Sequence, residues 1–415
     1  MTSADSPALV SVVSRPTDRV DELLTFTSPD TPLAWWRRGD GFVGFGVAAT
    51  LTASGANRTA ELAAQWRDFV ASASIDDTVG VMGSGLVAFG AIAFDAESAA
   101  TSTLIVPRVI VGQRHDAAWV TTITPAGAAP IDPVETGFGD YWPATLGPGL
   151  LTPEGYQQAV RDGLAAIADG TVGKVVLARD IVGTIPADAD LRRLSRALQA
   201  GYPDCWNFAV DGLIGASPET LVTVSNGTLT ARVLAGTASR GADADADTAA
   251  ATALVTSQKD QDEHRYAVAS VTAALATHTT ALAASEQPFM LKLPNVWHLA
   301  TDIEATLGER ESSLDLVAAL HPTAAVAGTP TAVALDVIRR IEPFDRHRYA
   351  GPVGWIDAAG DGEWAIALRC AQFEPVDDHI RVTAHAGAGI VAGSDPEKEM
   401  LETRVKFRPI IDAIA

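Results

Sequence analysis

The chain has 415 residues, of which 47% are hydrophobic and 20% are charged, a composition typical of a folded globular protein and not of a disordered one. Its 30 Lys and Arg residues against 51 Asp and Glu residues give a formal net charge of −21, which disfavours nucleic acid and anionic membranes as partners. The longest apolar stretch, 85–94, is about half as long as a bilayer span. We therefore expect a cytoplasmic protein with no nucleic-acid or membrane partner.

The two cysteines, Cys205 and Cys370, have no Cys or His nearby at the spacing of a metal site. Neither lies in the glycine-flanked turn typical of a cysteine nucleophile. This pattern predicts reduced thiols without a catalytic role.

Residues 1–145 are expected to form an N-terminal lobe of the same compact fold as the rest of the chain. Strand-like segments occupy 41–47, 86–94 and 102–111, and apolar residues at four-residue spacing predict a helix over 59–71. The stretch 124–149 is rich in Pro and Gly and predicts the boundary with a second region, 146–415.

The second region opens with a clear helix signal. Thr152 is a favourable N-cap, Pro153 suits the first helical position, and Gly170 marks the end. A strand is expected over 172–182, where the alternation of side chains places Lys174 on one face with Val176.

The remaining segments predict an α+β fold with large, mostly antiparallel sheets covered by helices, because strands come in groups with helices between them. Strands are expected over 205–210, 213–216, 221–224, 229–234, 296–303, 353–357, 364–372 and 379–385, and helices over 248–254, 260–277, 314–320, 331–341 and 396–414.

Two acidic pairs lie on predicted helices. Asp260 and Glu263 are three residues apart and share one helix face, and Glu399 and Glu402 repeat that spacing on the last helix, followed by Lys406. If the two faces met, they would form a hard oxygen site for Mg²⁺. Each pair alone is also consistent with an ordinary solvated helix face.

Three further side chains have both a chemical and a structural interpretation. Lys174 is either a lysine reaching the rim of its sheet or a desolvated base, and Glu219, in the turn GASPETLV, is either a turn carboxylate or a general acid with a raised pKa. Arg369 suits a carboxylate ligand but equally a buried ion pair.

Two glycine-rich turns, 234–241 and 387–393, allow backbone N–H groups to approach an anion. The GxG fragment at 387–389 lacks the following helix of a dinucleotide site, which disfavours NAD. Together the candidates describe a pocket for a small dianion.

Read together, these segments resemble the chorismate-utilising enzymes, and within them the isochorismate synthases. Eight strings carry the resemblance, in the order in which the family uses them: KVVLARD (174–180), SPETLV (217–222), LAGTASRG (234–241), KDQDEHRYAVASV (259–271), HLATDIEATL (298–307), LHPTAAVAG (320–328), YAGPVGW (349–355) and GAGIVAGSDPEKEMLETRVKF (387–407). VAFGAIAFD (87–95) is similar to a family element in the first half. The implied fold is the chorismate-binding fold of anthranilate synthase component I.

The resemblance also implies roles. Lys174 matches the base that deprotonates the water attacking C2 of chorismate, and Glu219 matches the acid that protonates the departing C4 hydroxyl. The implied direct Mg²⁺ ligands are Glu263 and Glu402, and Asp260 and Glu399 hold metal-bound waters. The implied substrate-binding residues are Gly236, Thr237, His298, Tyr349, Arg369, Gly387, Gly389 and Lys406, with Ala325 and Val326 beside the ring.

The choice within the family rests on few positions. Ammonia-using anthranilate and aminodeoxychorismate synthases lack a lysine where Lys174 stands, so water is the expected nucleophile. Salicylate synthases share that lysine and go on to eliminate pyruvate, but the small apolar residues of HPTAAVAG resemble the isochorismate synthases. A noncatalytic small-anion-binding protein is the alternative outside enzymes. The resemblance favours a monomer.

Overall fold

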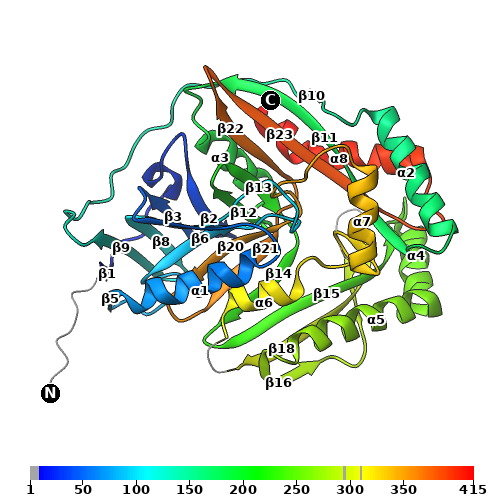
Figure 1. Ribbon diagram of the computed structural model, residues 1–415, viewed down its shortest axis with the longest axis horizontal. Coiled ribbons are helices and arrows are strands. Elements are labelled where there is room, and N and C mark those ends of the chain that lie inside the picture. Colours follow the sequence, from blue (N-terminus) through cyan, green and yellow to red (C-terminus); the bar gives the residue numbers. More distant parts are fainter. Residues whose placement is uncertain (1–8, 293–295, 309–310) are drawn as a thin grey trace.

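The computed structural model describes residues 9–292, 296–308 and 311–415, apart from the side chains of Thr237, Ser239, Lys259, Glu263 and Val296. Two large β-sheets with helices packed around them make up the described part of the chain (Figure 1). None of the described helices is both long and apolar enough to cross a membrane.

Within the described residues, the first sheet has thirteen strands. In spatial order they are β10 (Gly147–Pro148), β11 (Lys174–Pro186), β23 (His379–Ile390), β22 (Cys370–Val376), β13 (Leu213–Ser217), β12 (Trp206–Val210), β2 (Leu33–Arg37), β3 (Asp40–Phe45), β8 (Val109–Arg114), β9 (Ala117–Pro125), β1 (Val10–Pro16) and β5 (Ala73–Asp77), and β19 (Gly328–Thr329) pairs with β11.

The second sheet has ten strands in the part of the chain that the structure describes. Their order is β16 (Thr279–Ala284), β18 (Val296–Leu307), β15 (Thr228–Ser239), β14 (Thr220–Ser225), β21 (Gly362–Ile366), β20 (Pro352–Asp357), β6 (Val87–Ala91), β7 (Ser102–Val106) and β4 (Ala49–Ala53), and β17 (Phe289–Lys292) pairs with β18.

Neighbouring strands are antiparallel throughout the described ladders, except that β1 and β5 are parallel. This confirms the expected α+β class. Strands from the N-terminal third join both sheets, through the pairs β2–β12 and β6–β20. The boundary predicted near residue 145 therefore separates two stretches of sequence that share their sheets.

The helices are α1 (Arg58–Ala71), α2 (Pro153–Ala168), α3 (Arg192–Gly201), α4 (Ala244–Thr256), α5 (Gln258–Leu275), α6 (Ser313–Leu320), α7 (Thr331–Ile341) and α8 (Pro396–Ile414), with a short 3₁₀ helix at Leu23–Phe26. α8 packs on β23 and on α2, and α5 packs on β15 and β18 (Figure 1).

Local chemistry explains where the two best-predicted helices begin. The Thr152 hydroxyl accepts a hydrogen bond from the backbone N–H of Gly155, and Pro153 follows it at the start of α2. Asp395 caps α8 by accepting from the N–H groups of Glu397 and Lys398. Both starts agree with the sequence-based expectation.

A cluster of aromatic side chains fills the core where β2, β3 and β9 of the first sheet face β20 of the second. Trp35, Trp119, Trp355 and Phe42 are fully buried there, and the ring centroids of Phe42 and Trp355 lie 5.3 Å apart in an edge-on arrangement. Such pairs add to the free energy gained from burying their area.

Two predicted strands each proved to be two strands in different sheets. The run 102–111 divides into β7 and β8 around Pro107, and the run 364–372 divides into β21 and β22. The expectation that Arg369 lies within a strand was wrong. Arg369 lies in the crossover with φ of 50°, because the chain passes there from one sheet to the other.

Candidate active site

An open cavity of about 1800 Å³ is lined by residues of β11 and β12 in the first sheet, of β14, β15 and β18 in the second, of α5 and of the segment 319–331. Three of the predicted site residues, Lys174, Glu219 and Ala325, line it. These residues are far apart in the sequence, so the fold brings them to one space large enough for a small organic molecule.

Lys174 begins β11 and lies across the neighbouring strand β23. A methyl group built on Gly389 would come within 3.0 Å of Lys174 Cε and 3.7 Å of its Nζ. Gly389 pairs with Val176 in the ladder, so the absence of its side chain leaves room for the Lys174 chain. The glycine therefore matters through the space it leaves rather than through backbone flexibility.

Glu219 lies in the turn between β13 and β14 at the cavity wall. Its carboxylate accepts no hydrogen bond from any described residue, although the peptide N–H and C=O groups of Glu219 are bonded to Ser217 and Ile366. Burial raises the pKa of the Glu219 carboxyl, against the opposing effect of the positive charges on Lys174, Lys406 and Arg369. The group can therefore keep its proton at a higher pH than an ordinary glutamate.

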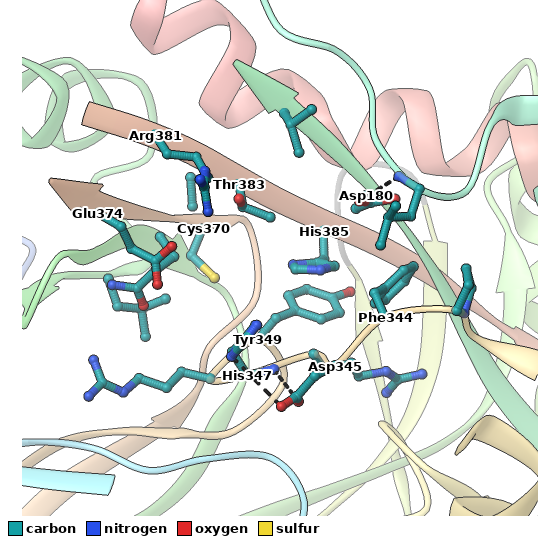
Figure 2. Close-up of a pocket in the computed structure, with 18 residues that line it drawn as sticks. Asp180, Phe344, Asp345, His347, Tyr349, Cys370, Glu374, Arg381, Thr383 and His385 are labelled. Atoms are coloured by element: carbon teal, nitrogen blue, oxygen red, sulfur yellow. Dashed lines mark hydrogen bonds and ion pairs between the residues drawn. The ribbon is translucent and has the colours of Figure 1, made fainter. Parts of the chain in front are cut away.

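Tyr349 and Arg369 belong to two loops that meet beside the first sheet. Burial raises the pKa of the Tyr349 phenol to about 12, so it remains a neutral hydrogen-bond donor. Burial lowers the pKa of Arg369, while Tyr349 and Glu402 act in the opposite direction. The Tyr349 ring stacks on His385 of β23 (Figure 2).

Lys406 connects α8 to the sheet. Its Nζ donates a hydrogen bond to the carbonyl of Gly387 at 2.7 Å and forms an ion pair with Glu402 at 2.5 Å. A methyl group on Gly387 would lie 2.4 Å from the Leu177 carbonyl oxygen, so a larger residue would push β23 away from β11. The fold thus brings together Lys406 and Gly387, two of the predicted substrate-binding residues.

Carboxylates gather along one face of α8 near Lys406. Burial raises the pKa of the Glu399 carboxyl. The negative charges of Glu402 and Asp395 raise this pKa further, whereas a hydrogen bond from Ser394 and the positive charge of Lys406 lower it. Since like charges one helical turn apart repel, a cation beside them would be favourable.

The other half of the predicted metal site is only partly described. Asp260 lies in the first turn of α5, and a methyl group on Gly236 would come within 3.3 Å of its Cβ. Glu263 lies outside the described side chains. Among the side chains that are described, no three of His, Cys, Asp and Glu gather closely enough to hold a metal ion. The donors on α8 are nevertheless hard oxygens, the ligands that Mg²⁺ prefers.

His298 of β18 pairs in register with Thr237 of β15, next to a bulge at Gly236, whose φ is 78°. Burial lowers the pKa of His298, the backbone of Gly236 raises it, and the charge of Lys174 lowers it further. His298 is therefore neutral at physiological pH and within electrostatic reach of Lys174. The side chain of Thr237 lies outside the described part.

The two residues predicted to lie beside the ring differ in position. Ala325 is exposed and lines the cavity, whereas Val326 is 3% exposed and packs in the main core. Sequence reasoning did not identify the cavity-facing side of α5, formed by Tyr266, Ala267 and Ser270. The sequence feature that could have identified this side of α5 is the run of small residues one turn after Asp260 and Glu263.

Three comparisons bear on this geometry. A family described as "Chorismate binding enzyme" matches residues 2–131 and 146–415. The chain is 41% identical over 274 residues to isochorismate synthase DhbC of Bacillus subtilis, across 63% of this chain and 68% of that protein.

Solved structures agree with the fold. The menaquinone-specific isochorismate synthase MenF from Escherichia coli superposes with a TM-score of 0.74 and 25% identity, over 99% of this chain and 96% of that one. Anthranilate synthase component I from Streptococcus pneumoniae has a TM-score of 0.65 at 18% identity, over 99% and 94% of the two chains, and shares the fold. The chain therefore belongs to the chorismate-binding enzyme family.

Proposed function

We propose that the protein is an isochorismate synthase, which converts chorismate into isochorismate by adding water at C2 and releasing the C4 hydroxyl as water. The observation that carries this proposal is that Lys174 and Glu219 line the same cavity, where burial raises the pKa of the Glu219 carboxyl. An amine and a protonated carboxyl at one site supply a base and an acid.

In the proposed reaction Lys174 removes a proton from the attacking water. Glu219 gives its proton to the leaving hydroxyl, which departs as a second water molecule. The raised pKa of Glu219 suits this role, because an acid that has already ionised has no proton to transfer. One water molecule is added and one is lost, and Lys174 gains a proton while Glu219 gives one up, so the overall reaction is an isomerisation.

The substrate carries two carboxylates, and a cavity with several acidic residues must offer them positive charge. The buried Tyr349 hydroxyl and the Arg369 guanidinium are the proposed partners of the enolpyruvyl carboxylate, together with the backbone at Gly387 and Gly389. Lys406, His298, Gly236 and Thr237 are proposed to line the remainder of the pocket.

A magnesium ion completes the proposal. Glu263 and Glu402 would bind it directly, and Asp260 and Glu399 would hold its water ligands. Bound Mg²⁺ would supply positive charge for the ring carboxylate of the substrate. Lys406, which pairs with Glu402, would offset part of the remaining negative charge on α8.

We retain three further expectations as parts of this proposal: a monomer, a cytoplasmic location, and no nucleic-acid or membrane partner. The net charge of −21 supports the absence of polyanionic partners.

The test is to incubate the purified protein with chorismate and Mg²⁺ and to separate the products by chromatography. Isochorismate alone is the expected result. Salicylate with pyruvate would indicate a salicylate synthase, an amino product formed only with ammonia would indicate an anthranilate or aminodeoxychorismate synthase, and unchanged chorismate would indicate a binding protein. Full activity in excess EDTA would refute the magnesium assignment.

Lys174→Ala tests the base, with Lys292→Ala as the matched control. Both lysines line the cavity, but Lys292 is exposed near the ring of Trp297 and has no proposed part in the reaction. We expect Lys174→Ala to stay folded and lose turnover, and Lys292→Ala to keep it. A Lys174→Ala protein with near-normal kcat would contradict the mechanism.

A further inference from the structure

We infer that His385 is a positioning residue, which holds the phenol ring of Tyr349 in the orientation that its proposed contact with the substrate requires. The inference rests on the proposed function, because that proposal assigns Tyr349 to substrate binding.

The two rings form a buried stack. Their centroids lie 5.2 Å apart with an interplanar angle of 25°, and His385 and Tyr349 are 7% and 9% exposed. Phe344 contacts the same imidazole, with centroids 5.0 Å apart and planes at 49° (Figure 2). Aromatic pairs at these separations have a preferred geometry, so the imidazole restricts the tilt of the phenol.

Packing, rather than hydrogen bonding, sets this arrangement. Within the described part of the chain, neither the Tyr349 hydroxyl nor the His385 imidazole forms a hydrogen bond to another residue. Burial lowers the pKa of His385 to about 3, with Arg346 and His347 lowering it and Asp345 opposing them. The imidazole is therefore an uncharged flat surface, and the phenol hydroxyl remains available to a ligand.

A hollow of about 460 Å³ lies beside the stack and explains why a backing residue is needed. His385 and Tyr349 line it together with Cys370, Gln372 and Thr383 (Figure 2). If the imidazole were removed, this space would extend along the phenol ring, and the ring could tilt into it. A closely packed neighbour on that side prevents the tilt.

The position of His385 on β23 ties it to the rest of the site. Residues 385, 387 and 389 share one face of the strand, because successive residues alternate between its two faces. Gly387 accepts the hydrogen bond from Lys406, and Gly389 leaves room for Lys174. One strand therefore sets the Tyr349 ring, the Lys406 ammonium and the Lys174 chain in a common register.

The experiment compares His385→Ala and His385→Phe with a control, Thr383→Ala, which alters the same hollow two residues earlier on β23. We expect His385→Ala to raise KM for chorismate by about 10-fold or more while kcat changes by less than about threefold. His385→Phe retains a flat ring and should restore KM, and Thr383→Ala should not change it. Thermal melting checks that each variant is folded.

A double-mutant cycle separates positioning from general packing. If His385 acts through the Tyr349 hydroxyl, His385→Ala has little further effect on KM in a Tyr349→Phe background. An equal fold-change in both backgrounds, or a His385→Phe variant as weak as His385→Ala, would overturn the inference alone. A wild-type protein that neither binds nor converts chorismate would instead overturn the proposed function, and this inference with it.

Discussion

Two glutamates in the same region of the fold show how a structural carboxylate differs from a proposed catalytic one. Glu363 of β21 is 4% exposed and accepts hydrogen bonds from the indole N–H groups of Trp35 and Trp355 at 2.9 and 3.1 Å, and it pairs with Arg114 at 3.1 Å. Glu219 lies beside β14, the strand that pairs with β21, yet no described residue donates to its carboxylate.

The difference lies in the size of the surrounding side chains. Around Glu363 large indole rings fill the space and point their only polar atoms at the carboxylate, so its negative charge is compensated. The cavity that Glu219 lines has small side chains in its wall, among them Ala235, Ala324 and Ala325. A carboxylate that accepts no hydrogen bond from the described residues and lies beside such a space is available to a substrate.

The largest expected effect comes from Glu219→Gln. Because an amide cannot donate the acidic proton, kcat should fall by roughly 10²- to 10⁴-fold. The free energy of unfolding at pH 8 should stay the same or rise, since a carboxyl whose pKa is raised by folding destabilises the folded state once it ionises.

The control for this change is Glu304→Gln, which removes an exposed carboxylate lining the same cavity and should leave kcat unchanged. Steady-state kinetics and denaturant unfolding provide the two measurements. A Glu219→Gln protein with normal kcat would show that Glu219 is not the acid of the reaction.

Glu363→Gln should instead reduce stability and leave kcat nearly unchanged. It leaves Arg114 without its counter-ion in a largely buried position, which should lower the free energy of unfolding by about 3 kcal/mol. The kcat of the folded fraction should change little, because Glu363 does not line the cavity. Urea unfolding at pH 7 measures the loss, and unchanged stability would contradict the structural role.

Asp357 is an intermediate case that sharpens the comparison. Its carboxylate accepts two backbone N–H groups, from Ala359 and Asp361, yet burial and the charge of Asp361 raise its pKa to about 7. Because the folded pKa exceeds the unfolded value, its contribution to stability is fully present below about pH 4 and is lost as the pH rises through 7.

Asp357→Asn keeps an oxygen acceptor but cannot ionise. We expect it to raise the free energy of unfolding by about 2 kcal/mol at pH 8 and to have a much smaller effect at pH 4. Unfolding curves measured between pH 4 and pH 8 provide the check, and the same gain at both ends would show that ionisation is not the cause.

The smallest effect is expected from Gly389→Ala. The new methyl group would lie 3.0 Å from Lys174 Cε and should displace the amine, lowering kcat by about 10-fold with little loss of stability. Gly393→Ala is the matched control, because no atom of the described residues lies within 4 Å of a methyl group there. Equal kinetics for the two variants would show that Lys174 does not depend on the space over Gly389.

Local features of the sequence determined a large part of this structure. The caps at Thr152 and Asp395, each followed by proline, correctly predicted where α2 and α8 begin, because a cap depends on residues within one turn. Ordered motifs spread over residues 174–407 predicted the family, which the comparisons confirmed. The same motifs named Lys174, Glu219 and Ala325, which the fold places on one cavity.

Only the tertiary structure decided the features that depend on distant partners. The run around Arg369 has the composition of one strand, but its two ends pair with different sheets, so the chain turns there. The stack of His385 on Tyr349 and the space that Gly389 leaves for Lys174 likewise join segments far apart in the sequence. Strand pairing and side-chain packing are contacts between distant residues, and local propensity carries no information about them.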